Sequence, residues 1–419
     1  MQENEKLVLG IDLCDDITQV TVMRPHAAEP DAVCFDARTR KEFLPTLLGL
    51  DREGQWSIGE IQSDGVTLVP FFHAAVRGET VECRGNVYTG RELLERYLHL
   101  LTEKIRERFE PQEAGFVAVT CEDANTNADV KELLYEILEQ REGFAGRCLV
   151  LSHLEAFLHF VIRQEEGLWK NGSAVFDYTT EGLLYYHMDC RMAGGRRLVL
   201  ADYRDYSEIV PADFIKKEDD GQGALVFERL AGEVLQQKVA SLFVTGRGFE
   251  GDWVSDVLRL LSSGRRVFRG QNLYTQGACY AGAERFREER NAEFSVLTPD
   301  QITVDVALVA ENAAQEEEVK LAEMGAAYRE VDAKVEVLLD TTDKLTFRIL
   351  SAGEGTPRLI RMAPNLPGLR GDRTSRYEIR VFFVKRDMMV IQLKDTGFGA
   401  FYPSSHRIYE ELVDFSHCD

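Results

Sequence analysis

This sequence has too few basic residues to balance its acidic ones, and it has no long apolar run. Its 419 residues include 49 Lys and Arg against 71 Asp and Glu, a formal net charge of −22. Such an acidic chain repels nucleic-acid phosphates, so we expect no DNA or RNA partner. No run of about 18 apolar residues occurs, and the N-terminal MQENEK has no basic stretch leading into an apolar one. We therefore expect a soluble, cytoplasmic protein without a membrane partner.

Paired cysteines are also missing. None of the eight cysteines has CxxC spacing, and no Cys/His cluster has the sequence spacing of a zinc site. Because disulfides need an oxidising compartment, we interpret the cysteines as buried free thiols of a reducing cytosol. The histidines show no ligand spacing apart from His153 and His187, which fall near a predicted cleft, and we interpret these as packed or surface side chains.

A repeated order of elements is what the sequence does contain. Residues 1–170 and 171–290 each predict three strands, then helix, strand, helix, strand and helix. Each half should form a mixed sheet flanked by helices, and two such lobes leave a cleft in which ligands bind. The predicted strands are 7–13, 19–24, 32–36, 116–121, 148–151, 173–178, 183–189, 197–203, 241–245 and 267–268, and the predicted helices are 91–109, 126–141, 154–164, 224–239, 252–261 and 273–285.

The pattern changes at about residue 290, and we predict a β-rich domain over 291–419. Strand-like runs are separated by turns that contain Gly and Pro. We expect 316–323 to be a charged helix or loop edge and 353–371 to be a loop. The aromatic stretch 393–411 favours a domain edge over a ligand loop. The strand-like runs are 303–309, 335–339, 344–350, 377–384 and 388–393.

Two strand–turn–strand segments occupy equivalent places in the halves. In LVLGIDLCDDITQV the first strand ends at Asp12, and in GSAVFDYTTEGLL it ends at Asp177. Nucleotide sites use such turns, with an Asp near a hydrated metal ion, although ordinary hairpins have polar turns too. Related by the repeat, the two turns should face each other across the cleft. In SLFVTGRGFEGDW, Gly246 and Gly248 would let a ligand approach the backbone between a strand and a helix.

Together these segments resemble the actin, hexokinase and heat-shock ATPase superfamily, and most closely its DnaK-type chaperone branch. The implied fold is a duplicated actin-like (ribonuclease-H-like) one with two lobes. In the second connecting helix, Gly277 and Ala278 would permit close helix packing. The resemblance covers about residues 5–290. It is carried by LGIDLCDD, FLPTLLGLDREGQWSIGE, FVAVTCEDANTNADVKELL, LSHLEAFLHF, VFDYTTEG, FVTGRGFEGDW and NLYTQGACYAGA.

The resemblance also implies a ligand, ATP or ADP with Mg²⁺, held between the lobes. Asp12 and Asp177 would hold the metal and orient its water, and Glu155 would help to place the attacking water. If the protein is an active enzyme, it would then be an ATP hydrolase. The residues implied to border the nucleotide are Gly10, Leu13, Cys14, Asp15, Thr179, Thr180, Gly182, Gly246, Arg247, Gly248 and Phe249.

The phosphate turns depart from that family. Residues 13–16 stand where Gly and Ser or Thr are usual, and residues 178–181 replace consecutive glycines. The lysine expected shortly after Gly59 is missing, since residues 60–63 are Glu-Ile-Gln-Ser. A like-charge pair at ~4 Å costs about 4 kcal/mol at an effective dielectric constant of ~20, so added carboxylates disfavour a triphosphate. We therefore expect weak hydrolysis or none.

The sequence is compatible with two functions. One is a chaperone-like protein that binds ATP and uses lobe closure to regulate its C-terminal β domain or an unidentified protein partner. The other is a nucleotide-free scaffold for protein assembly. A small-molecule kinase of the same superfamily is disfavoured, because no substrate-binding insert is visible.

Overall fold

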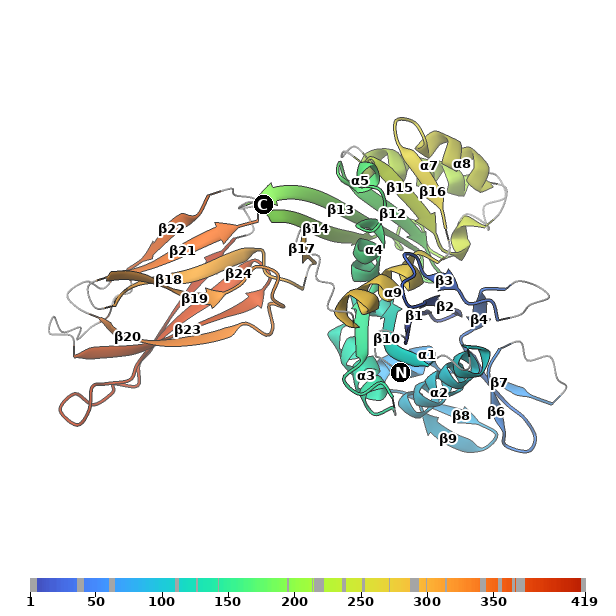
Figure 1. Ribbon diagram of the computed structural model, residues 1–419, viewed down its shortest axis with the longest axis horizontal. Coiled ribbons are helices and arrows are strands. Elements are labelled where there is room, and N and C mark those ends of the chain that lie inside the picture. The colour runs from blue at the N-terminus through green and yellow to red at the C-terminus, as the bar shows by residue number, and fades with distance from the viewer. Residues whose placement is uncertain are drawn as a thin grey trace. The chain divides into compact units, whose positions relative to one another are not determined.

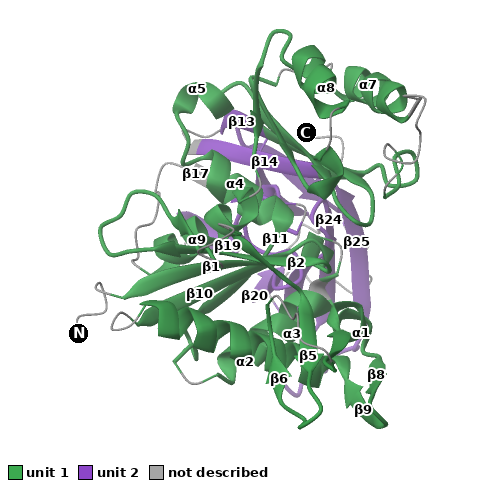
Figure 2. Cartoon of the chain, turned by 90° about the vertical axis from the view of Figure 1, so that its right-hand side faces the viewer, with its two compact units in different colours: residues 1–188, 203–291 green, residues 189–202, 292–419 purple. Residues whose placement is uncertain are grey.

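The computed structural model is a mixed α/β structure with several sheets (Figure 1). The chain divides into two compact units, residues 1–188 with 203–291 and residues 189–202 with 292–419 (Figure 2). The predicted boundary at 170/171 falls inside the first unit. Parts of the predictions for 32–36, 224–239 and 353–371 lie outside the described residues. Those described are 6–35, 41–59, 65–109, 113–125, 127–141, 143–193, 196–212, 214, 222–235, 239–250, 253–270, 272–286, 294–298, 300–312, 315–339, 344–352, 356–363, 366 and 374–415.

The first sheet lies in unit 1 and has the order β11-β10-β1-β2-β3, with β4 also paired to β2. β1 runs parallel to β10 and antiparallel to β2, and β10 runs parallel to β11. The bounds confirm most of the predicted elements. The strands are β1 (Leu7–Leu13), β2 (Ile17–Met23), β3 (Asp31–Ala32), β4 (Phe43–Pro45), β10 (Ala114–Cys121) and β11 (Cys148–Ser152).

The second sheet has the matching order β16-β15-β12-β13-β14, followed by β17. β12 runs parallel to β15 and antiparallel to β13, and β15 runs parallel to β16. The three strand directions around β12 therefore equal those around β1. The strands are β12 (Ser173–Tyr178), β13 (Leu183–Ala193), β14 (Arg196–Asp205), β15 (Ser241–Thr245), β16 (Arg266–Arg269) and β17 (Phe294–Leu297).

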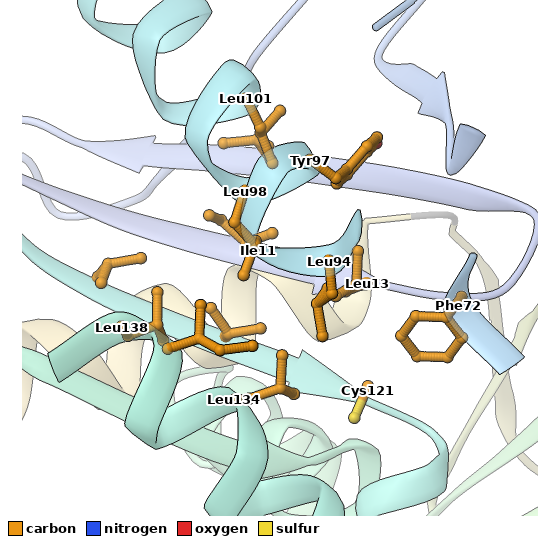
Figure 3. Close-up of a cluster of buried hydrophobic side chains, with 14 of the residues drawn as sticks. Ile11, Leu13, Phe72, Leu94, Tyr97, Leu98, Leu101, Cys121, Leu134 and Leu138 are labelled. Carbon is orange, nitrogen blue, oxygen red and sulfur yellow. The ribbon is translucent and has the colours of Figure 1, made fainter. Parts of the chain in front are cut away.

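Alternation along β1 and β12 decides which side chains reach the space between these sheets. Side chains of a strand alternate between its two faces. The odd-numbered residues of β1 pack with α2 and α3 in one apolar cluster (Figure 3), whereas Gly10 contacts α9 on the other face. In β12, Phe176 and Tyr178 pack with α7 and α8. Asp12 and Asp177 consequently point toward α4 and α9. The helices are α2 (Gly90–Phe109), α3 (Ala128–Glu139), α4 (His153–Val161), α5 (Glu166–Trp169), α7 (Gln222–Val234), α8 (Trp253–Leu261) and α9 (Leu273–Phe286).

Small elements that the sequence did not predict connect β4 to α2. They form a three-stranded sheet and a separate hairpin. These strands are two to four residues long, too short for a periodic pattern to stand out. The strands are β5 (Leu47–Leu50), β6 (Trp56–Ser57), β7 (Thr67–Pro70), β8 (Thr80–Cys83) and β9 (Asn86–Thr89), and the short helix α1 (Phe72–Arg77) lies between β7 and β8.

Unit 2 contains two four-stranded sheets, β19-β18-β21-β22 and β20-β23-β24-β25, whose inner faces share one apolar cluster. The predicted charged helix or loop edge at 316–323 is wrong, since it is strand β19, exposed over most of its length and paired with β18. The predicted loop at 353–371 contains strand β22. The bounds are β18 (Val304–Asn312), β19 (Gln315–Ala322), β20 (Asp332–Leu339), β21 (Leu345–Ser351), β22 (Arg358–Met362), β23 (Ser375–Lys385), β24 (Met388–Asp395) and β25 (Ile408–Asp414).

Among the residues described, no helix is long and apolar enough to cross a membrane.

Helices α4 and α9 approach each other closely at Gly277. A Cβ atom there would lie 1.8 Å from the backbone oxygen of Ala156, so only glycine fits. The close packing expected at Gly277 is thus confirmed. This close packing places α9 against α4 near the ends of β1 and β12.

We predict that Gly277→Ala lowers the free energy of unfolding by about 1–3 kcal/mol, the usual cost of overpacking. Gly232→Ala is the matched control, because Gly232 lies in α7 and a Cβ atom added there would meet no atom within 4 Å. That control should stabilise the chain by about 0.5–1 kcal/mol. Urea unfolding followed by circular dichroism measures both. Equal effects of the two changes would contradict the close approach.

Candidate functional site

A pocket in unit 1 lies where the β1–β2 turn meets the β12–β13 turn. Both turns follow a strand that ends in an aspartate, Asp12 or Asp177. Seven carboxylates but only two arginines, Arg77 and Arg247, line it. The lining residues are Asp12, Cys14, Asp15, Asp16, Ile17, Gln19, His73, Val76, Arg77, Glu122, Asp123, His153, Asp177, Thr179, Thr180, Glu181, Thr245, Gly246, Arg247 and Tyr274.

The imidazole of His153 stands between the two strand-end aspartates. Its Nε2 lies 2.7 Å from Asp12 Oδ1, and its Nδ1 lies 3.7 Å from Asp177 Oδ2. The side chain is 1% exposed. His153 is the first residue of α4, and the hydroxyl of Ser152 caps that helix. The start of α4 therefore fixes the ring between residues contributed by the two sheets.

Tyr274 of α9 completes this arrangement. Its ring stacks on His153, with the centroids 3.8 Å apart and the planes 8° apart. Its hydroxyl donates a hydrogen bond of 2.8 Å to Asp177 Oδ2. Burial and the neighbouring Asp177 raise the pKa of Tyr274 well above its usual range, so the hydroxyl keeps its proton. We call Asp12, His153, Asp177 and Tyr274 the buried tetrad.

Charge within the buried tetrad depends on His153. Burial by itself opposes protonation of the ring, but Asp12 and Asp177 outweigh that effect and raise the pKa of His153 to about 10. The ring is therefore an imidazolium at neutral pH. Nearby, burial and then Asp177 raise the pKa of Glu122 to about 8, so this carboxyl group holds its proton as well.

His73 and Arg247 make further contacts with the turns, among more exposed side chains of the pocket. His73 of α1 lies 3.2 Å from Asp15 and 3.6 Å from Glu181, one carboxylate from each turn. Arg247 Nη1 donates to Asp16 at 2.9 Å. These groups are partly exposed, so each contact contributes about 0–1 kcal/mol.

Some of the predicted site residues line this pocket and others do not. Asp12, Cys14, Asp15, Asp177 and the two threonines line it, as do Gly246 and Arg247. Glu155 does not. Its carboxylate accepts hydrogen bonds from the Ser152 backbone N–H and from Lys131 Nζ, and so caps α4. The other predicted residues outside the lining are Gly10, Leu13, Gly182, Gly248 and Phe249.

Tyr178 packs directly against the glycines that were predicted to border adenosine. A Cβ atom at Gly248 would lie 2.1 Å from the Tyr178 ring. Gly246 has φ of +92°, and a Cβ atom added there would clash with the Tyr178 carbonyl oxygen. The space over this turn is used by internal packing.

Sequence reasoning missed His153, Tyr274, Glu122 and His73. His153 had been interpreted as a packed or surface histidine, and its partner Asp12 lies 141 residues away. The available signal was its place near the predicted cleft, two residues before Glu155 in the segment LSHLEAFLHF. His187, its suggested neighbour, lies in β13 and outside the lining.

A family of unknown function, DUF5716 C-terminal, matches residues 29–299, which is more than half of the chain. The chain belongs to this DUF5716 family. Of the buried tetrad, His153, Asp177 and Tyr274 lie within the matched region and Asp12 precedes it. A domain of unknown function, DUF8552, matches residues 301–415 in unit 2. No match to a curated protein is found.

Protonation of His153 predicts how stability of this DUF5716 protein depends on pH. The pKa of the ring rises from 6.5 to about 10, so its contribution is complete below about 6.5. Between these values the folded chain binds more protons at His153 than the unfolded chain does. The free energy of unfolding should therefore fall as the pH rises toward 10.

Urea unfolding at a series of pH values checks this, with His153→Ala as the comparison. We expect the alkaline fall to be steeper in the natural chain than in the variant. Parallel pH profiles for the two proteins would show that His153 is not the group responsible. His73→Ala is the matched histidine-removal control, because His73 is 44% exposed and lies outside the buried tetrad.

Proposed function

We propose that unit 1 is an actin-like fold of the heat-shock ATPase type, in a form that no longer uses nucleotide. Support for the fold comes from the two sheets, which share strand order and strand directions around β1 and β12. It also comes from the pocket, which both strand-end turns line. An ancestral duplication accounts for both features.

The function that we propose is a nucleotide-independent scaffold for protein assembly. The observation that carries it is the position of His153. In the family that the sequence resembles, a magnesium ion lies near the residues corresponding to Asp12 and Asp177. Here a buried imidazole contacts both carboxylates and already supplies the positive charge. The residues present therefore do not fit magnesium in that place.

The charge and the packing of the other pocket residues also disfavour binding of a triphosphate. Six other acidic side chains line the pocket besides the protonated Glu122, and of its two arginines Arg247 is paired with Asp16. Tyr178 fills the approach to Gly248. Binding a polyanion here would require breaking ion pairs and overcoming like-charge repulsion.

A protein partner is supported by the surface of unit 2. Phe401 is 92% exposed, and Ile408 and Leu412 on β25 are each 55% exposed. Contiguous exposed apolar patches are typical of interaction surfaces, and these three side chains lie within residues 401–412. The DUF8552 region is therefore the part of the chain that we propose contacts the partner.

ATP binding remains the second candidate. It is favoured by the convergence of both turns on one pocket and by Arg77, which also lines it. In that case nucleotide would have to displace His153 from between the aspartates. ATP and Mg²⁺ thus stay a prediction of the resemblance.

Isothermal titration of the full chain with ATP and MgCl₂ separates the two candidates. We expect no saturable heat up to millimolar nucleotide, and we expect a tagged chain to retain the same partner proteins in ATP and in ADP. Saturable binding that is lost in Asp12→Asn would overturn the scaffold proposal. Circular dichroism of both proteins controls for folding.

A further inference from the structure

Three unlike metal-binding groups meet at one corner of the pocket: a carboxylate, a thiol and an imidazole. Cys14 Sγ lies 3.5 Å from Asp12 Oδ1 and 4.0 Å from His153 Nε2, and the latter two atoms are 2.7 Å apart. All three side chains line the pocket. We infer that Asp12, Cys14 and His153 form a site for a zinc-type divalent ion. This inference goes beyond the scaffold function and does not depend on it.

The spacing suits tetrahedral coordination. Zinc bonds of about 2.3 Å to sulfur and about 2.0–2.2 Å to nitrogen and oxygen place neighbouring ligand atoms roughly 3.4–3.6 Å apart. The S–O separation already matches. Cys14 and His153 must approach by about 0.4 Å, and Asp12 and His153 must separate by about 0.7 Å, to reach these values. Side-chain rotation suffices for shifts of this size.

The second observation is the surroundings of His153 Nδ1. This buried nitrogen has no hydrogen-bond partner in the described structure, and Asp177 Oδ2 lies 3.7 Å from it. Histidines that bind metal through one nitrogen commonly donate the other N–H to a carboxylate, which fixes the ring. Asp177 is placed for that role, and the Tyr274 hydroxyl and ring hold Asp177 and the imidazole in place.

Ligand type selects the ion. Magnesium and calcium prefer oxygen ligands, whereas thiolate and imidazole favour zinc and related transition metals. Binding would release the thiol proton of Cys14 and the proton on His153 Nε2 to solvent, and Nδ1–H would then face Asp177. A tetrahedral ion keeps a fourth position for water or for a ligand from the pocket.

The test uses the full chain, freed of metal with a chelator, and Zn²⁺ and Co²⁺ as probes. Titration calorimetry should show one tight Zn²⁺ site per chain. Co²⁺ should give a thiolate-to-cobalt charge-transfer band that excess Zn²⁺ removes. Cys14→Ser should abolish that band, and Asp177→Asn should weaken Zn²⁺ binding by about 10–100-fold.

Two control variants locate the signal. Cys34→Ser removes another partly exposed cysteine outside the pocket, and His73→Ala removes the imidazole from a separate candidate cluster, Asp15 with His73 and Glu181. Neither should change the band. A band that survives Cys14→Ser, or the absence of any one-to-one Zn²⁺ binding, would overturn the site. Because no nucleotide is present, these outcomes are independent of the ATP titration.

Discussion

The contact on which unit 1 depends is the buried imidazole of His153 between Asp12 and Asp177. Two carboxylates at the ends of two strands cannot be buried together without a positive charge or a proton. Three features of the surrounding structure position the side chains that make this contact. Strand alternation turns both aspartates inward, the Ser152 cap fixes the first residue of α4, and Gly277 allows α9 to bring Tyr274 onto the ring.

Under the scaffold proposal, this arrangement would account for an actin-like fold that works without nucleotide. In the ATPases that the sequence resembles, a bound ligand links the lobes and its loss releases them. Here the His153 side chain contacts both strand ends, so in this proposal the link needs no ligand. The space beside Gly248 is likewise occupied by the Tyr178 ring. Both features place side chains of the chain where the resemblance implies a ligand, and they favour the proposed scaffold over a switch.

Much of the fold followed from the sequence, and less of the site did. Long periodic helices such as α2 and apolar strands such as β10 were predicted correctly because their patterns are local. Strand β19 was missed, since an exposed, acidic edge strand has no apolar alternation. Asp12 and Asp177 were found from the repeat. Their histidine was not, because 141 residues separate His153 from Asp12 and only tertiary packing joins them. Glu155 was predicted to help place an attacking water, but it caps α4 and lies outside the pocket lining.

A double-mutant cycle between His153 and Asp177 tests the central contact most directly. The free energies of unfolding of the natural chain, His153→Ala, Asp177→Ala and the double variant would be measured on chelator-treated protein. The account predicts a coupling free energy of about 1–3 kcal/mol, as for contacting residues in one buried network. Additivity within about 0.5 kcal/mol would contradict it, because the two side chains would then not act on each other.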